Sequence, residues 1–366
     1  MRVLLATRHA YFPQRYGGSE TSTHATALAL RSRGISVAVL AGLTPNGWTG
    51  IITRIKRKLL PERPSPHLVG IGYRVFRARD AVRELELAAR HFKPDIVVVQ
   101  AGHPLLLAAR ANELGIPVVV HLRDVQFDRL GGDPRSLEVQ AWFANSNFTA
   151  ARFAAAYGID SEVIPNFVDP DSYRVPGPGH KVTFINPVPD KGLDVAFRLA
   201  ERNPEIPFLF VEGWPLRAAV REELVDRARA SGNIEWRPAT RNMKTVYADT
   251  RVLIVPSQWE EAWGRVASEA QISGIPILAS NRGGLPEAVG PGGLLLPHDD
   301  LEAWEASLRR LWHNPVCWQE YVDAARTHAA RAELAPENIL GIYVDALRRC
   351  LSDRVDSDRR LEGGGD

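Results

Sequence analysis

Two acidic residues, Glu261 and Glu269, are separated by seven residues and flank Gly264. The apolar run of residues 252–257 before them is typical of a buried parallel strand, and the pattern after Gly264 is typical of a helix. Eight positions rotate a helix by about 800°, which would leave the two side chains about 80° apart. We therefore expect Glu261 in the loop before the helix and Glu269 in its second turn. The backbone N–H groups left free at this helix start would be those of Trp263, Gly264, Arg265 and Val266.

Free amide groups at a helix start favour an anion, whereas a carboxylate on each side would repel a bare phosphate. A ligand that carries both phosphates and hydroxyl groups satisfies both conditions. A nucleotide-diphosphate sugar fits, with its phosphates on the amides, one glutamate on the ribose and the other on the sugar. The alternative is an ordinary amphipathic helix with solvated carboxylates.

The stretch from Trp259 to Gly293 also contains the segment SGIPILAS, which has the pattern of a strand, and a GGLPE turn. Both follow the two glutamates at matching positions. The stretch resembles the donor-site signature of the retaining glycosyltransferases of family 4. The resemblance implies the GT-B fold, an α/β architecture in which two Rossmann-like domains with parallel doubly wound sheets face a central cleft. It also implies that Glu261 contacts the transferred sugar and that Glu269 contacts the nucleotide ribose.

Two further places in the chain match the donor site of this family. Gly17 and Gly18 precede a predicted helix, and the resemblance implies that they face the donor phosphates, although a plain tight turn also explains the pair. Lys191 precedes another predicted helix, and the resemblance places it on the same phosphates. Asn186, followed by Pro187, stands in the donor site where the family has Gly-Arg, which removes one positive charge. We expect Arg265 to compensate for it.

His121 closes the apolar strand PVVVHL. The resemblance implies that it approaches the donor sugar and the reaction centre, while a packed, hydrogen-bonded histidine is the alternative. Arg123, Asp124 and Asp128 follow in the same loop and are candidates for acceptor contacts.

Strands alternate with helices along most of the chain, which predicts parallel doubly wound sheets. The first strand is not followed by G-x-G-x-x-G, which weighs against a dinucleotide-dependent oxidoreductase. The predicted organisation is an acceptor-side domain (1–168), a hinge (169–180), a donor-binding domain (181–336), a helix that crosses back toward the first domain (337–352) and a disordered tail (353–366).

The 366 residues carry a net charge of +2, which gives no global attraction to nucleic acid. The two cysteines match no metal or redox spacing, and no apolar run approaches the ~18 residues of a membrane span. We therefore expect a cytoplasmic protein without metal or cofactor. Residues 51–60 form a short basic amphipathic segment that can cover the acceptor cleft or contact the inner face of a membrane.

Together with these features, the resemblance implies a retaining, metal-independent glycosyltransferase. It would transfer a sugar from a UDP- or GDP-sugar to an acceptor hydroxyl of a lipid, a polysaccharide or a small metabolite. The leaving phosphate would help to deprotonate the acceptor on the front face of the sugar. The alternatives are a sugar-nucleotide epimerase of the same fold and a non-catalytic subunit that binds nucleotide sugars.

Overall fold

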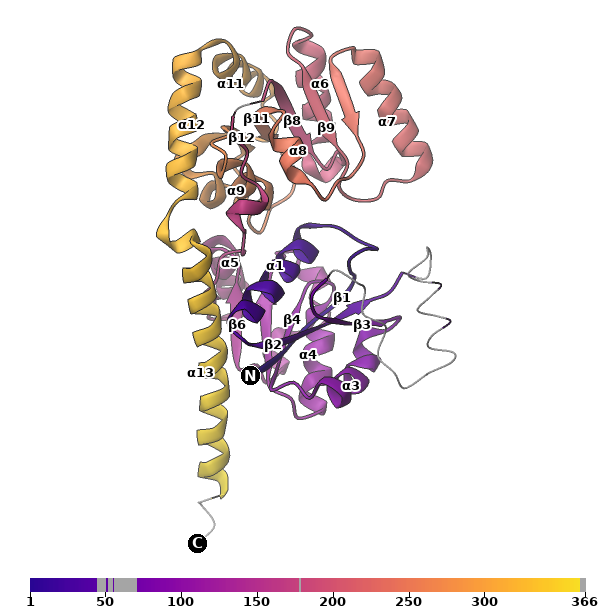
Figure 1. The fold of residues 1–366 in the computed structure, drawn as a ribbon, viewed down its shortest axis with the longest axis vertical. Helices are drawn as coiled ribbons and strands as arrows, with labels where there is room; N and C mark the ends of the chain where they lie inside the picture. Colours follow the sequence, from indigo (N-terminus) through magenta and orange to yellow (C-terminus); the bar gives the residue numbers. More distant parts are fainter. Residues whose placement is uncertain (45–50, 52–54, 56–70, 178, 363–366) are drawn as a thin grey trace. The chain divides into compact units, whose positions relative to one another are not determined.

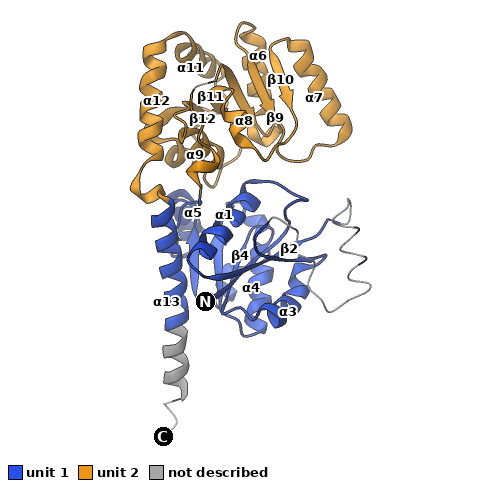
Figure 2. Ribbon diagram, in the orientation of Figure 1, with its two compact units in different colours: residues 1–167, 336–366 blue, residues 168–335 orange. Residues whose placement is uncertain are grey.

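The computed structural model describes residues 1–44, 51, 55, 71–177 and 179–362 (Figure 1). Its contacts divide the chain into two compact units (Figure 2). Unit 1 contains residues 1–167 and 336–366, and unit 2 contains residues 168–335. The last helix of the chain therefore belongs to unit 1, although it follows unit 2 in the sequence.

Unit 1 is built on a parallel sheet of seven strands. In spatial order these strands are β3 (Arg74–Ala78), β2 (Ser36–Gly42), β1 (Arg2–Ala10), β4 (Ile96–Gln100), β5 (Val118–Leu122), β6 (Ala141–Ala144) and β7 (Glu162–Val163). The helices of unit 1 are α1 (Gly18–Ser32), α3 (Ala81–Phe92), α4 (Pro104–Glu113), α5 (Asn147–Tyr157) and α13 (Pro336–Glu362).

Both faces of this sheet are buried, which explains why its strands read as continuous apolar runs. Val3 and Leu5 of β1 belong to one core cluster and Leu4 to another, since successive side chains of a strand point to opposite faces. Helices α1 and α13 cover the first face, and α3 and α4 cover the second. Helix α13 continues to Glu362, through residues that the sequence pattern assigned to a disordered tail.

Unit 2 repeats this plan with a six-stranded parallel sheet. In spatial order its strands are β10 (Ile234–Arg237), β9 (Phe208–Val211), β8 (Lys181–Ile185), β11 (Thr250–Val255), β12 (Ile277–Ser280) and β13 (Gly293–Leu296). Its helices are α6 (Leu193–Arg202), α7 (Ala218–Ser231), α8 (Met243–Tyr247), α9 (Arg265–Gln271), α10 (Leu285–Val289), α11 (Leu301–His313) and α12 (Pro315–Ala329).

Each sheet has one point at which the strand order reverses. In unit 1 it lies between β1 and β4, and in unit 2 it lies between β8 and β11. In open α/β sheets the loops that follow two such strands diverge, and ligands bind beyond the carboxyl ends of the strands. The topology therefore points to one candidate site in each unit.

Candidate functional site

The reversal point of unit 2 brings together residues that are far apart in the sequence. Strands β8 and β11 pair in parallel, with Phe184 opposite Ile254. The loop after β8 supplies Asn186 and Lys191, and the loop after β11 supplies Glu261. The topology thus places the predicted cation and the predicted sugar carboxylate at one edge of the sheet.

Lys191 and Glu261 form a shielded ion pair. The Lys191 Nζ lies 2.5 Å from the Glu261 Oε1, and the Ser257 hydroxyl donates to the same oxygen at 2.7 Å. The side chains are only 17% and 13% exposed. Burial alone would raise the pKa of Glu261, but the charge of Lys191 and the hydrogen bonds outweigh it and keep the pKa below its ordinary value. Glu261 is therefore a carboxylate at neutral pH.

Two indoles cover this ion pair. The Lys191 Nζ lies 4.4 Å from the ring centroid of Trp259 and 5.4 Å from that of Trp214. The two rings meet edge to face, with their centroids 5.5 Å apart. An ammonium over the face of an indole is attracted by the ring quadrupole, so both rings help to hold the lysine in place. Neither indole is predicted from the sequence to have a role, although Trp259 stands two residues before Glu261 and Trp214 directly follows the loop glycine after an apolar strand.

Helix α9 starts where the sequence predicts. Gly264 is its N-cap with a φ of 101°, and a Cβ there would lie 2.5 Å from the Leu285 side chain, so the position requires glycine. Trp263 is 6% exposed, and its indole N–H donates to the Ser268 hydroxyl at 2.8 Å. Its side chain anchors the turn, as does Val266, which packs against the core. Only the backbone of these residues remains for a ligand.

Glu269 is almost buried and is held by two partners. Its Oε1 accepts from the Arg265 Nε at 2.7 Å, and its Oε2 accepts from the Tyr247 hydroxyl at 2.8 Å. Arg265 also donates to the Tyr173 hydroxyl at 3.0 Å. The guanidinium expected to compensate for the missing arginine is thus engaged with Glu269 and Tyr173 in this structure. Spacing i,i+4 on one helix was a signal for this pair in the sequence.

Asn186 has a structural task in the same region. Its backbone adopts a left-handed conformation with a φ of 66°, and its Oδ1 accepts a hydrogen bond from the backbone N–H of Trp214 at 2.8 Å. The side chain is 8% exposed. Asn186 therefore shapes the loop that presents Trp214.

Gly17 and Gly18 lie at the start of α1 in unit 1. Gly17 is the N-cap in an extended conformation, and no side chain caps this helix. A Cβ placed on Gly18 would meet no described atom within 4 Å. The glycine pair therefore leaves the start of α1 open to a ligand.

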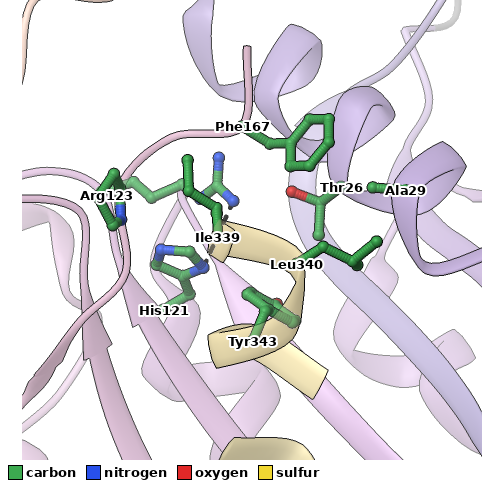
Figure 3. Close-up of a pocket in the computed structure, with 9 residues that line it drawn as sticks. Thr26, Ala29, His121, Arg123, Phe167, Ile339, Leu340 and Tyr343 are labelled. Carbon is green, nitrogen blue, oxygen red and sulfur yellow. Dashed lines mark hydrogen bonds between the residues drawn. The ribbon is translucent and has the colours of Figure 1, made fainter. Parts of the chain in front are cut away.

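His121 lies inside β5 and is 1% exposed. It packs against Phe143 and Tyr343, and its Nδ1 lies 3.4 Å from an Arg123 nitrogen (Figure 3). Its Nε2 is buried and has no hydrogen-bond partner among the described residues. In unit 1 the ring of His121 has the packed environment of the alternative. The physical reason is that α13 covers this face of the sheet. The approach of His121 to the donor sugar stays a prediction.

The three acceptor candidates after β5 are placed separately. Arg123 lines a pocket with His121 and Tyr343 (Figure 3). Its guanidinium lies 3.4 Å from the Asn166 Oδ1. The carboxylate of Asp124 accepts from the Gln126 N–H and closes its own loop. Asp128 lies in a short 3₁₀ turn, Phe127–Arg129. Asp124 is thus engaged within its own loop, whereas Arg123 contacts a distant segment. Their role as acceptor contacts stays a prediction.

The burial of His121 predicts a dependence of stability on pH. Desolvation, followed by the charge of Arg123, holds the pKa of His121 well below its ordinary value, so the folded state keeps the ring neutral. The unfolded chain binds a proton as the pH falls through about 6.5, so stability is lost below that pH. Between pH 7.5 and 5.5 this loss amounts to about 1.4 kcal/mol. Urea unfolding of His121→Gln at both pH values measures this effect. Between pH 7.5 and 5.5 the free energy of unfolding of the variant should fall by about 1.4 kcal/mol less than that of wild type. An unchanged loss, or an equal reduction in the control His91→Gln on α3, would contradict the account.

Within the described residues, no group of three or more His, Cys, Asp and Glu side chains could hold a metal ion. None of the described helices is both long and apolar enough to cross a membrane. The basic segment predicted over residues 51–60 lies outside the described residues, apart from positions 51 and 55.

Comparisons with known proteins agree with this architecture. Residues 16–172 match the family described as Glycosyltransferase Family 4, and residues 181–330 match the one described as Glycosyl transferases group 1. The D-inositol 3-phosphate glycosyltransferase of Thermobifida fusca is 32% identical over 177 residues, which are 44% of this chain and 40% of the relative. The match thus spans less than half of that relative's length.

Two solved structures share the fold over nearly the whole chain. Anabaena HepE in complex with UDP-glucose has a TM-score of 0.75 at 18% identity, covering 94% of this chain and 99% of its own. Sucrose-phosphate synthase from Thermosynechococcus elongatus has a TM-score of 0.77 at 15% identity, covering 96% and 100%. Two parallel doubly wound sheets with these neighbours define a two-domain α/β protein of the GT-B class. Together with the two matched regions, they show that the chain belongs to glycosyltransferase family 4.

Proposed function

We propose that this chain transfers a sugar from a UDP- or GDP-sugar to an acceptor hydroxyl, with retention of configuration and without a metal. The observation that carries this proposal is the Lys191–Glu261 pair at the reversal point of unit 2. A sugar diphosphate presents anionic oxygens and hydroxyl groups side by side. The pair offers an ammonium for the first and a carboxylate for the second.

In the proposed reaction, negative charge develops on the departing diphosphate and positive charge at the anomeric carbon. Lys191 and the open start of α9 would stabilise the diphosphate. Glu261 would accept hydrogen bonds from sugar hydroxyls and orient the ring. The departing phosphate oxygen would take the acceptor proton, so no additional base is required. Glu269 would bind the ribose through whichever carboxylate lone pairs Arg265 and Tyr247 leave available.

The comparisons suggest the first compounds to try. HepE was crystallised with UDP-glucose, and the curated relative is named for D-inositol 3-phosphate. We propose UDP-glucose as the first donor and D-inositol 3-phosphate as the first acceptor.

A thermal-shift screen of UDP, GDP, ADP and the matching sugar nucleotides tests the binding step. A ligand at 100 times its Kd stabilises the folded state by about 2.7 kcal/mol, so the melting temperature should rise with the preferred nucleotide. Products from the best donor are then analysed with and without acceptor. A glycosylated acceptor with the α linkage of the donor supports the proposal. A changed sugar nucleotide formed without acceptor would indicate an epimerase instead, and binding without any turnover would indicate a non-catalytic subunit.

A further inference from the structure

The reversal point of unit 1 carries a second cluster of ionisable side chains, which the proposed function does not use. It lies between β1 and β4, where the register of β1 against β2 shifts after Ala6. His9 stands at the carboxyl end of β1, and Gly102 follows β4. The loops of both strands therefore meet where an open α/β sheet binds ligands.

Glu20 is the buried centre of this cluster. It lies in the first turn of α1 and is only 2% exposed. One of its oxygens, Oε1, lies 3.3 Å from the His9 Nδ1 and 3.5 Å from the Arg15 Nε. The Ser19 hydroxyl donates to that oxygen at 3.0 Å. The other oxygen, Oε2, is buried and has no hydrogen-bond partner among the described residues.

The charge of Glu20 is maintained despite its burial. Burial alone would raise the pKa of Glu20, but the contacts with His9, Arg15 and Ser19 outweigh it and lower the pKa. A buried carboxylate beside an imidazole fixes the orientation of that ring, as in many sites where a histidine meets a ligand. His9 itself is 30% exposed, so its ring is reachable from solvent while Glu20 is not.

The loop after β4 fits closely around His9. Three consecutive residues, Ala101, Gly102 and His103, have positive φ values of 48°, 63° and 60°. A Cβ on Gly102 would lie 2.7 Å from the His9 Cδ2, so this position requires glycine. Left-handed residues other than glycine cost on the order of 1–3 kcal/mol each and persist only where surrounding structure enforces them. The loop conformation therefore confines the imidazole from the β4 side, and on the α1 side the Glu20 carboxylate lies 3.3 Å from the His9 Nδ1 as an ionic contact.

We propose that His9, oriented by Glu20, binds a hydroxyl group of the acceptor at the reversal point of unit 1. The inference rests on the proposed transferase function and names its acceptor-contacting residue. An imidazole edge donates or accepts one hydrogen bond, which suits a hydroxyl. The charges of Arg15 and Glu20 offset each other, so the cluster does not select a free anion. Glu20 is a positioning residue, because its own oxygens are out of reach of solvent.

Competition between water and glycerol for the donor sugar tests this proposal. The purified full chain is incubated with UDP-glucose and molar glycerol, and glucosyl-glycerol, free glucose and released UDP are quantified. In wild type the ratio of glucosyl-glycerol to free glucose should exceed the molar ratio of glycerol to water. His9→Gln should lower the glycerol-to-water product ratio at least tenfold, while the Kd for UDP stays within twofold. His91→Gln, on α3 and away from the cluster, should leave both unchanged.

Glu20→Gln separates positioning from folding. It should lower the same product ratio several-fold, and a merely structural loss would instead lower the melting temperature and UDP release in proportion. The acceptor assignment would be overturned if the glycerol-to-water product ratio of His9→Gln equalled that of wild type, whatever the UDP affinity of the variant. It would also be overturned if the wild-type product ratio were no higher than the molar ratio of glycerol to water. Absence of binding and release of both UDP and GDP in wild type, tested with UDP-glucose and the matching GDP-sugar, would overturn the proposed function itself.

Discussion

Replacing Glu261 with Gln is expected to reduce sugar transfer by on the order of 100-fold or more, while UDP binding changes only a few-fold. The amide keeps the shape of the side chain and its contact with Ser257 but loses the charge that faces Lys191. In the proposed reaction the same charge orients the sugar hydroxyls. Interactions that orient the reacting sugar act on turnover more than on nucleotide affinity. Initial rates and UDP titrations of the same preparations measure both effects.

The neighbouring acid provides the control for this change. Glu260→Gln removes the same charge one position earlier in the chain and should keep at least half of the wild-type rate. Transfer by Glu261→Gln within threefold of wild type would contradict the role given to the Lys191–Glu261 pair. Equal losses in both variants would contradict it as well, because they would indicate a general effect of charge in the loop.

Replacing Glu269 with Gln is expected to weaken UDP binding at least tenfold and to destabilise unit 2 by about 3–5 kcal/mol. The Arg265 side chain is 9% exposed, so losing its carboxylate partner leaves a buried guanidinium without compensation for its charge. The proposed contact of Glu269 with the ribose would be lost in the same step. Calorimetric titration of UDP and urea unfolding measure the two effects.

The double variant Arg265→Met, Glu269→Gln separates stability from binding. It removes both charges, so it should recover most of the stability lost by Glu269→Gln while UDP affinity stays low. Recovery of affinity together with stability would show that Glu269 supports the fold and does not contact the nucleotide. Wild-type affinity in Glu269→Gln would exclude the ribose contact directly.

The sequence pattern predicts the fold for a physical reason, while the resemblance implied that Lys191 and Glu261 both belong to the donor site. Apolar strand runs alternating with helices specify parallel sheets, and such sheets gather the residues after their strands at one edge. Lys191 and Glu261 both follow such strands, and the pairing of β8 with β11, which the structure shows, brings them together. The start of α9 was equally predictable, since Gly264 interrupts the apolar pattern where the helix begins.

What the sequence did not predict depends on contacts between distant segments. The run VVVHL is buried on both faces, so no alternation tells which neighbour His121 meets, and Tyr343 comes from the far end of the chain. Trp214 reaches Lys191 because β9 pairs with β8. The periodicity of apolar residues within one strand does not predict which strands are neighbours. The same limit applies to His9 and Gly102, which are brought together by the pairing of β1 with β4.

Amide hydrogen exchange with and without UDP-glucose tests most directly whether unit 2 holds the donor at Lys191, Glu261 and the start of α9. The account predicts slower exchange on ligand addition in peptides covering residues 186–193 and 257–271. Peptides from α7 and α11 serve as the internal reference and should not change. A ligand that raises the melting temperature but leaves exchange in both donor-site segments unaltered would contradict the account.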